Sequence, residues 1–185
     1  METVKLNQNN LAKIRTPVLI PAYNRDEVKP GIVHLGLGHF HRAHQALYLE
    51  RLLNKGVTRA GLFEINLVKD AFPLAKIAGE QDYLYTLLTK SRDGAETVRI
   101  IGSIRGYSNA TEDGESAIAG IAEAETCALT MTITEKGYYW DAASGDLDWN
   151  AEALVHDLAH PAEPQSAAGL IAAALKRRYA KSMPK

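Results

Sequence analysis

Apolar and polar residues are arranged along the chain in blocks whose period changes between that of strands and that of helices. The run 32–38, "IVHLGLG", is short, apolar and interrupted by glycines, which is typical of a buried strand that ends in a turn. From 42 to 54 apolar residues recur every three or four positions, which predicts an amphipathic helix. The run 61–67, "GLFEINL", predicts a second strand, and a further helix is expected from Lys69 to Gln81.

The middle of the chain has the composition of strands. Two β-rich runs cover 83–91 and 97–107. The sequence "RDGAE" lies between them, and its Asp93-Gly94 pair predicts a hairpin turn.

The pattern then returns to helices. Residues 114–126, "GESAIAGIAEAET", predict a helix, and 127–134, "CALTMTIT", predict a buried strand. A loop region rich in Gly, Asp and Pro runs to Gln165. The last predicted helix covers 166–181, with Ser166 as its N-cap and basic residues in its final turn.

This alternation predicts an α/β fold with a largely parallel sheet. We expect an N-terminal arm at 1–30 and a Rossmann-like, doubly wound domain with a β-hairpin insertion at 31–185. In a right-handed βαβ unit a helix returns the chain for another strand, but only "SMPK" follows the last helix. Either the sheet ends on a helix or the domain is truncated before its last strands. The second alternative predicts an unpaired sheet edge that could support self-association.

The composition and net charge limit the classes of binding partner that we expect. The 185 residues are 46% apolar and 23% charged with a formal net charge of -1, which offers no general attraction to nucleic acid or to anionic lipid. The start is polar, and no apolar run approaches the roughly 20 residues that span a bilayer, so we expect a cytoplasmic protein with no membrane partner. The single cysteine, Cys127, cannot form an intrachain disulfide and is expected to be a buried strand thiol.

Two glycines mark the transition from the first strand to the first helix. Gly36 and Gly38 occupy the positions at which a dinucleotide fingerprint needs a tight turn and close access to a pyrophosphate, although His41 stands where a third glycine is usual. Glu64 follows at the expected carboxyl end of the second strand. It lies 23 residues after His41, close to the roughly 20 at which an acidic residue binds the adenosine ribose and repels a 2′-phosphate. The pattern therefore favours NAD over NADP. The alternative is a structural glycine turn with an unrelated glutamate.

Four of the six histidines gather around this turn, at positions 34, 39, 41 and 44. They fall on a strand, a turn and a helix, and neighbouring ones do not share a helix face, so no metal site is expected. His41 and Arg42 at the helix start could contact a phosphate, or Arg42 could form a structural salt bridge. The motif "HDLAH" at 156–160 lacks the glutamate of a metalloprotease helix and is interpreted as a helix end.

One further carboxylate lies at a position where ligands bind. Glu135 follows the predicted strand at 127–134, at the carboxyl edge of the sheet. It could contact substrate or relay a proton, or it could belong to a solvated turn.

The sequence "GIVHLGLGHFHRAHQALYLERLL" resembles the N-terminal signature of the long-chain mannitol dehydrogenase family, which includes mannitol 2-dehydrogenase, fructuronate reductase and tagaturonate reductase. The stretches "QDYLYTLLTKSRDG", "RIIGSIRGY" and "LTMTITEKGYYWD" resemble it further, in the same order. The resemblance extends from about Gly31 to nearly the end of the chain. It implies a Rossmann-like fold and NAD-dependent interconversion of a secondary alcohol and a ketone on a polyol or sugar acid.

The resemblance also implies roles for single residues. It implies that Glu64 selects the adenosine ribose and that Glu135 lies near the proton path. Family members are much longer, and the resemblance places their catalytic lysine, asparagines and histidine in a helical C-terminal domain that has no counterpart among these 185 residues. The residues that it implies for the cofactor turn are Gly36, Gly38, Phe40 and Arg42, and His41 joins them as a cofactor-binding candidate from its place at the helix start.

Two interpretations follow. In the first, the chain is the cofactor-binding part of a polyol or hexuronate dehydrogenase and is inactive alone. In the second, it is a non-catalytic, truncated module for nucleotide binding or for assembly. The joint presence of the glycine turn, Glu64 and "TITEKGYY" favours the first.

Overall fold

The computed structural model describes residues 4–15, 17–69 and 78–181, which form two units that interleave along the sequence. The first unit comprises the described residues of Met1–Pro30, His39–Leu62 and Asp70–Gly106, and the second those of Gly31–Gly38, Phe63–Lys69 and Tyr107–Lys185. The division of the sequence into an arm at 1–30 and a domain at 31–185 stays a prediction.

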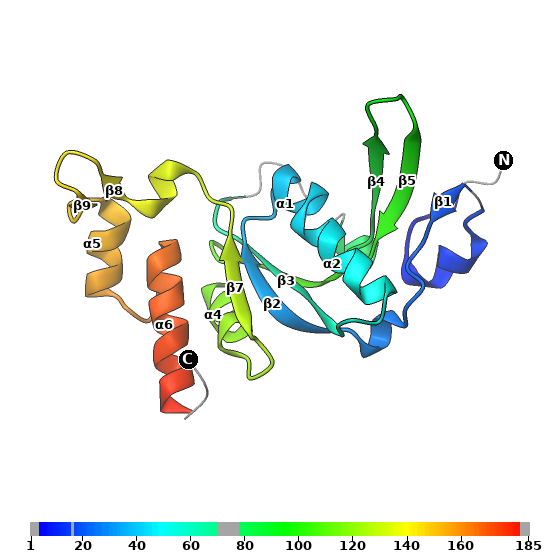
Figure 1. The fold of residues 1–185 in the computed structure, drawn as a ribbon. Helices are drawn as coiled ribbons and strands as arrows, with labels where there is room; N and C mark the ends of the chain where they lie inside the picture. The colour runs from blue at the N-terminus through cyan, green and yellow to red at the C-terminus, as the bar shows by residue number, and fades with distance from the viewer. Residues whose placement is uncertain (1–3, 16, 70–77, 182–185) are drawn as a thin grey trace. The chain divides into compact units, whose positions relative to one another are not determined.

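Most residues of a four-stranded sheet belong to the second unit (Figure 1). Its order is β6-β3-β2-β7, so the strands stand third, second, first and fourth in their order along the chain. β2 and β7 pair in parallel, with Val33 opposite Leu129. This order is that of a doubly wound Rossmann sheet, and the predicted fold class is confirmed. The strands are β2 (Lys29–Leu35), β3 (Ala60–Asn66), β6 (Ile104–Asn109) and β7 (Ala128–Met131).

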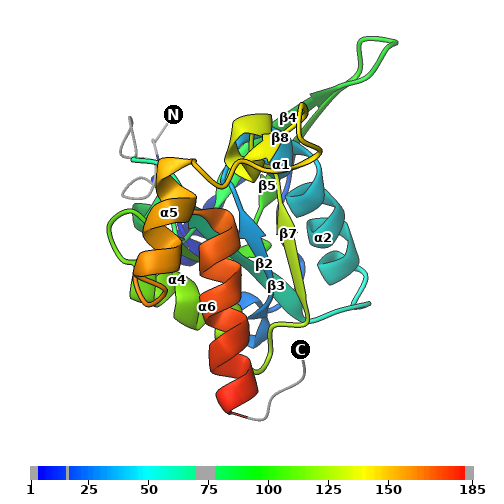
Figure 2. The same ribbon diagram turned by 90° about the vertical axis from the view of Figure 1, so that its left-hand side faces the viewer.

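Two helices of the second unit pack side by side and close its core (Figure 2). They are α4 (Gly114–Ala122) and α6 (Ala167–Ala180), and both were predicted from the apolar period. Asp113 caps α4 by accepting from the Ser116 N–H at 2.8 Å. The buried apolar side chains that meet here include Val33, Leu35, Ile65, Ile118, Ile121 and Leu170.

The start of α6 is held by two caps. Ser166 accepts from the Gly169 N–H at 2.9 Å, which confirms the predicted N-cap. Asp157, on α5 (Glu152–Ala159), accepts from the Ser166 hydroxyl at 2.5 Å and from the Gln165 N–H at 2.6 Å. α5 lies inside the predicted loop region, where the sequence predicted only its end. It ends before His160, so "HDLAH" is a helix end, as predicted.

The Asp157 cap leads to a pH prediction. Burial acts to raise the pKa of Asp157, but hydrogen bonds from Ser166, Gln165 and His156 outweigh it and hold the pKa below its usual value. The carboxylate should therefore stabilise the fold above the unfolded-state pKa of about 3.9, and this stability should be lost as pH falls through the lower folded pKa. Free energies of unfolding for wild type and Asp157→Asn should differ at neutral pH and converge in acid. A difference independent of pH would contradict the prediction.

The first unit contains a three-stranded sheet of order β1-β5-β4. Its strands are β1 (Val18–Leu19), β4 (Tyr85–Lys90) and β5 (Glu96–Ile101). β4 and β5 form the predicted antiparallel hairpin (Figure 1). Ser91 donates its N–H to the Ala95 carbonyl at 2.9 Å, and Gly94 has a φ of +87°, so the predicted Asp93-Gly94 turn is confirmed. β1 was missed because it has only two residues.

The apolar run 97–107, predicted as one strand, is divided between two sheets. β5 ends at Ile101 and β6 begins at Ile104. At Gly102 the backbone turns to buried side chains of the first unit: its N–H donates to Glu50 at 2.8 Å, and its carbonyl accepts from Arg25 at 3.1 Å. These bonds replace a strand ladder at this point, and the sequence pattern alone does not show them. Burial and the charge of Arg105 lower the pKa of Arg25 to about 10.

The predicted helix at 42–54 is two helices. α1 (His39–Ala43) and α2 (Gln45–Asn54) are separated at His44. The predicted helix at 69–81 falls largely on residues 70–77, which lie outside the described residues. The remaining short elements are η1 (Gln8–Lys13), η2 (Arg25–Glu27), η3 (Glu135–Tyr138), β8 (Trp140–Asp141) and β9 (Asp146–Leu147).

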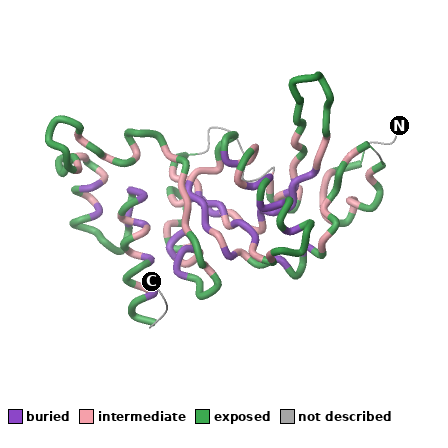
Figure 3. The backbone as a smooth tube through the Cα atoms, viewed as in Figure 1, coloured by how far each residue is buried: buried purple, intermediate pink, exposed green. Residues whose placement is uncertain are grey.

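The strand predicted at 127–134 is present as β7, but the expectation that it is buried was wrong. Cys127 is exposed, with its thiol 3.1 Å from the Gly31 carbonyl, and β7 is only partly buried, whereas the last three residues of β2 are buried (Figure 3). The physical reason is position: among the described strands, β7 is at the edge of its sheet, so one side of it has no neighbouring strand. No helix in the described part of the chain is long and apolar enough to span a membrane.

Candidate functional site

The turn after β2 requires glycine at its first position. Gly36 has a φ of +111°, a conformation that L side chains rarely adopt, and a Cβ there would stand 2.6 Å from the Thr132 carbonyl oxygen. The Gly36 N–H donates to the Ile65 carbonyl at 2.8 Å, and its own carbonyl accepts from the Gly38 N–H at 2.7 Å. The first bond fixes the turn to β3, and the second lies within the turn.

The second glycine of the turn has open space beside it. Leaving aside Gly38 and its two chain neighbours, the only heavy atom of the described residues within 4 Å of a Cβ built there is the Gly36 carbonyl oxygen, at 3.9 Å. Gly38 is exposed, and α1 begins at the next residue, His39. The predicted order of strand, glycine turn and helix is confirmed. An exposed backbone with this much room is what the approach of a pyrophosphate needs.

The residues after the turn lie on α1, in the first unit. Phe40 is exposed and stacks on His44, with ring centroids 4.4 Å apart. His41 is buried, and its Nδ1 lies 3.2 Å from the Gln45 side-chain oxygen. These side chains were predicted to bind the cofactor, and that role stays a prediction.

Arg42 has one unsatisfied donor. Its guanidinium carbon lies 5.9 Å from the centroid of the Tyr85 ring, and the Tyr85 hydroxyl donates to the Arg42 carbonyl at 2.6 Å. The Arg42 Nε is buried and has no hydrogen-bond partner among the residues that the structure describes. The choice between a phosphate contact and a structural salt bridge stays open, but a buried donor without a partner favours an acceptor supplied by a ligand.

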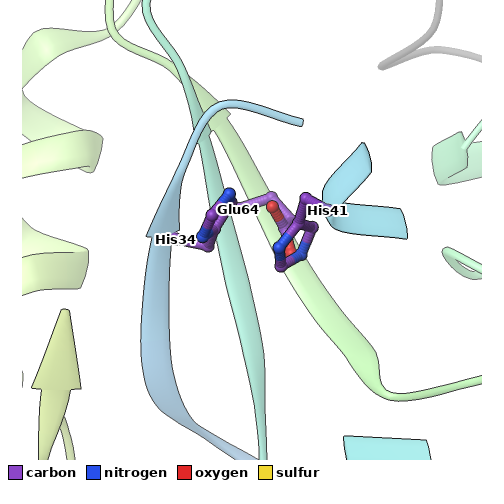
Figure 4. A group of neighbouring side chains, drawn as sticks. All are labelled: His34, His41 and Glu64. Atoms are coloured by element: carbon purple, nitrogen blue, oxygen red, sulfur yellow. The ribbon is translucent and has the colours of Figure 1, made fainter. Parts of the chain in front are cut away.

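Glu64 lies in a different setting from the one predicted. β3 continues to Asn66, so Glu64 stands two residues before the strand end, and it is fully buried. Its carboxylate and a ring nitrogen of His34, on the neighbouring strand β2, lie within 4.8 Å of each other (Figure 4). The ribose role of Glu64 stays a prediction, and it requires the carboxylate to become accessible when a nucleotide binds.

His34 was treated as a strand residue and its contacts were missed. Its Nδ1 lies 2.7 Å from the Thr130 hydroxyl and its Nε2 lies 2.9 Å from the Thr132 hydroxyl. With both ring nitrogens already hydrogen-bonded, His34 is poorly placed to be a metal ligand. A signal was present in the sequence: Thr130 and Thr132 alternate along β7, and the parallel register puts Thr130 opposite His34. Reading it required knowledge of which strands pair.

Glu135 lies where the sequence placed it, beyond the end of a strand. β7 ends at Met131, and Glu135 is the first residue of η3, with its side chain exposed. Its place near a proton path stays a prediction.

The sequence matches the family model of the mannitol dehydrogenase Rossmann domain over residues 30–184. The chain belongs to the mannitol dehydrogenase family. The resemblance drawn from the glycine turn is thus confirmed, and members of this family provide the comparisons for the site.

Two curated relatives from Escherichia coli (strain K12) are similar along most of this chain. The uncharacterized oxidoreductase YeiQ is 40% identical over 173 residues, which are 92% of this chain and 35% of that protein. D-mannonate oxidoreductase is 40% identical over 169 residues, 90% of this chain and 35% of that protein. This mannitol dehydrogenase family chain therefore spans about a third of the length of these relatives.

A solved structure of the family has the same fold. It is the Pseudomonas fluorescens mannitol 2-dehydrogenase in a ternary complex with NAD and D-mannitol, which superposes with a TM-score of 0.93 at 36% identity. The match covers 98% of this chain and 37% of that one. Nearly the whole of this chain therefore has the fold of the matching part of that mannitol 2-dehydrogenase.

Proposed function

We propose that this chain binds NAD at the turn from Gly36 to Gly38, as the cofactor-binding part of an oxidoreductase. The observation that carries the proposal is Gly36, whose positive φ and missing Cβ allow a turn in which no other residue fits. The likeness to a mannitol 2-dehydrogenase that was solved with NAD supports the same cofactor. The substrate class that we propose is a polyol or a sugar acid, since the relatives include enzymes named for mannitol and for D-mannonate.

The residues present fit a dinucleotide. Gly36 and Gly38 supply a backbone that a pyrophosphate can approach, and Gly38 has open space beside it. Arg42 carries a buried Nε without a partner among the described residues, and guanidinium groups bind phosphate well. Phe40 and His41 are proposed cofactor-binding residues because they directly follow the turn in the sequence. For Glu64 we propose the choice of NAD over NADP.

When bound, the nicotinamide supplies hydride transfer between the alcohol carbon of the substrate and the cofactor. The residues of this chain bind and orient the nucleotide. Glu135 is proposed to hold a proton close to the reacting centre, because its exposed carboxylate follows a strand at the edge where ligands bind in open α/β sheets. None of the catalytic lysine, asparagine and histidine residues implied by the resemblance is assigned here, so we propose that this chain alone contributes cofactor binding and not turnover.

The test is a titration of the 185-residue chain with NADH and, in parallel, with NADPH, followed by nicotinamide fluorescence. We expect saturable binding of NADH and weaker binding of NADPH, because a carboxylate near the ribose repels a 2′-phosphate. Glu64→Gln should reduce the preference for NADH. The matched control is Glu96→Gln, an exposed residue paired with Lys90 on the β4–β5 hairpin, which should leave both affinities unchanged.

The outcomes separate the parts of the proposal. Absence of NADH binding by a chain shown by circular dichroism to be folded would contradict the proposed function and leave the non-catalytic module as the better account. Binding of NADH with an unchanged preference in Glu64→Gln would remove Glu64 from the site and leave the glycine turn in it.

A further inference from the structure

A line of hydrogen bonds leads from the buried ring of His34 to the first glycine of the turn. The His34 Nδ1 lies 2.7 Å from the Thr130 hydroxyl, and the Nε2 lies 2.9 Å from the Thr132 hydroxyl. The Thr132 hydroxyl in turn donates to the Gly36 carbonyl, at 3.4 Å. All four residues belong to the second unit. The line therefore connects a side chain inside the sheet to the backbone that we propose as the cofactor site.

The partners define the direction of each bond. A hydroxyl has one proton, so if Thr132 donates to Gly36 it must accept from His34, whose Nε2 then carries the hydrogen. In the neutral ring the other nitrogen, Nδ1, is then an acceptor, and the Thr130 hydroxyl donates to it. One tautomer of His34 thus satisfies all three bonds. The opposite tautomer would direct the Thr132 proton to the ring and away from Gly36.

The bond to Gly36 affects the orientation of the whole turn. A trans peptide is planar, so the direction of the Gly36 carbonyl also sets the direction of the Leu37 N–H, which points the opposite way. The Gly38 N–H, at 2.7 Å, holds the same carbonyl from within the turn. Thr132 holds the Gly36 carbonyl from outside the turn. It directly follows β7, and its own N–H donates to the Leu35 carbonyl at the end of β2, at 3.0 Å.

We propose that His34, Thr130 and Thr132 are positioning residues: they hold the Gly36 carbonyl through one histidine tautomer and so preset the turn for the cofactor phosphates. The proposal rests on the proposed function, since it assigns these residues to the same site. They act through Gly36 and need no contact with the nucleotide.

The first test compares the NADH affinities of three variants. Thr132→Val keeps the shape and removes the hydroxyl, and it should weaken binding by about 3- to 10-fold, the effect of one modest hydrogen bond. Thr132→Ser keeps the hydroxyl and should restore affinity. The matched control is Thr126→Val, because the Thr126 hydroxyl also donates to a backbone carbonyl of this unit, that of Gly120 at 3.0 Å, but away from the turn. It should bind NADH like wild type. Wild-type affinity in a folded Thr132→Val would overturn the proposal.

The second test needs no nucleotide. Nitrogen NMR of the histidine rings should show His34 protonated at Nε2 in the wild type, and Thr132→Val should move this signal together with the amide signal of Leu37. A His34 ring protonated at Nδ1, or a Leu37 amide signal that does not move, would overturn the proposed line of hydrogen bonds. If wild type fails to bind NADH, the proposed function fails, and the NMR result still decides whether the line of hydrogen bonds from His34 to Gly36 exists.

Discussion

Glu50→Ala is expected to lower the free energy of unfolding by about 3–5 kcal/mol. Glu50 lies on α2 and is 1% exposed. Its carboxylate accepts from the Tyr23 hydroxyl at 2.7 Å, the Gly102 N–H at 2.8 Å and the Asn54 amide at 2.8 Å. Alanine would leave these donors without their acceptor and would open a cavity beside α2. Urea unfolding followed by circular dichroism measures the loss.

Replacing Tyr23, which donates to Glu50, should change the free energy of unfolding less than replacing Glu50 itself. Burial, followed by the charge of Glu50 and its hydrogen bond, raises the pKa of Tyr23, so the phenol keeps its proton and stays a donor at neutral pH. Tyr23→Phe removes one donor and leaves the carboxylate with two others, so we expect a loss of only about 1 kcal/mol. Glu96→Ala, in an exposed ion pair with Lys90, should cost less than about 0.5 kcal/mol. A Glu50→Ala variant as stable as Glu96→Ala would contradict the role given to Glu50.

Gly36→Ala is expected to cost about 2–4 kcal/mol of stability and to weaken NADH binding by at least about tenfold. Two effects add: the φ of +111° disfavours any L side chain, and the new Cβ would stand 2.6 Å from the Thr132 carbonyl oxygen. The backbone must shift to relieve this contact, and the shift displaces the turn. Unfolding and nicotinamide fluorescence measure the two effects separately.

Gly94→Ala is the control for conformational strain alone. Gly94 has a similar φ of +87°, but in the described part of the chain, its two chain neighbours aside, no heavy atom lies within 4 Å of a Cβ built there. Its replacement should lower the free energy of unfolding by about 1 kcal/mol, the cost of the strained φ alone. It should leave NADH affinity unchanged, because Gly94 lies at the hairpin tip, distant in sequence from the Gly36 turn. Equal losses in both variants would show that the contact at Gly36 is unimportant.

The regular elements of this fold could be predicted from the sequence where a long apolar period or a strong turn signal was present. The strand before Gly36, the helix that ends at Ala122 and the helix capped by Ser166 all have such a signal. The break at Gly102 could not be predicted, because it depends on two buried side chains, Glu50 and Arg25, that are distant in the sequence. Neither could the exposure of Cys127, which depends on the position of β7 at the edge of its sheet.

The candidate site shows the same division. The glycine turn was predicted because a backbone with positive φ favours glycine, which can be recognised in the sequence. The contacts of His34 were missed because they join two strands whose parallel pairing and register are set by the fold. Glu64 was predicted from its spacing and from its expected place at a strand end, and neither reveals whether a side chain in a strand faces the core or solvent.

The central claim, that the turn from Gly36 to Gly38 binds a dinucleotide, is tested most directly by locating bound NADH on the folded chain. Backbone amide NMR during a titration with NADH does this. The account predicts that the amide signals of Gly36, Leu37 and Gly38 shift and saturate with NADH, while those of Gly94 and Gly145 do not move. Saturable shifts that leave the three turn residues unaffected, or no shifts in a chain with well-dispersed signals, would contradict it.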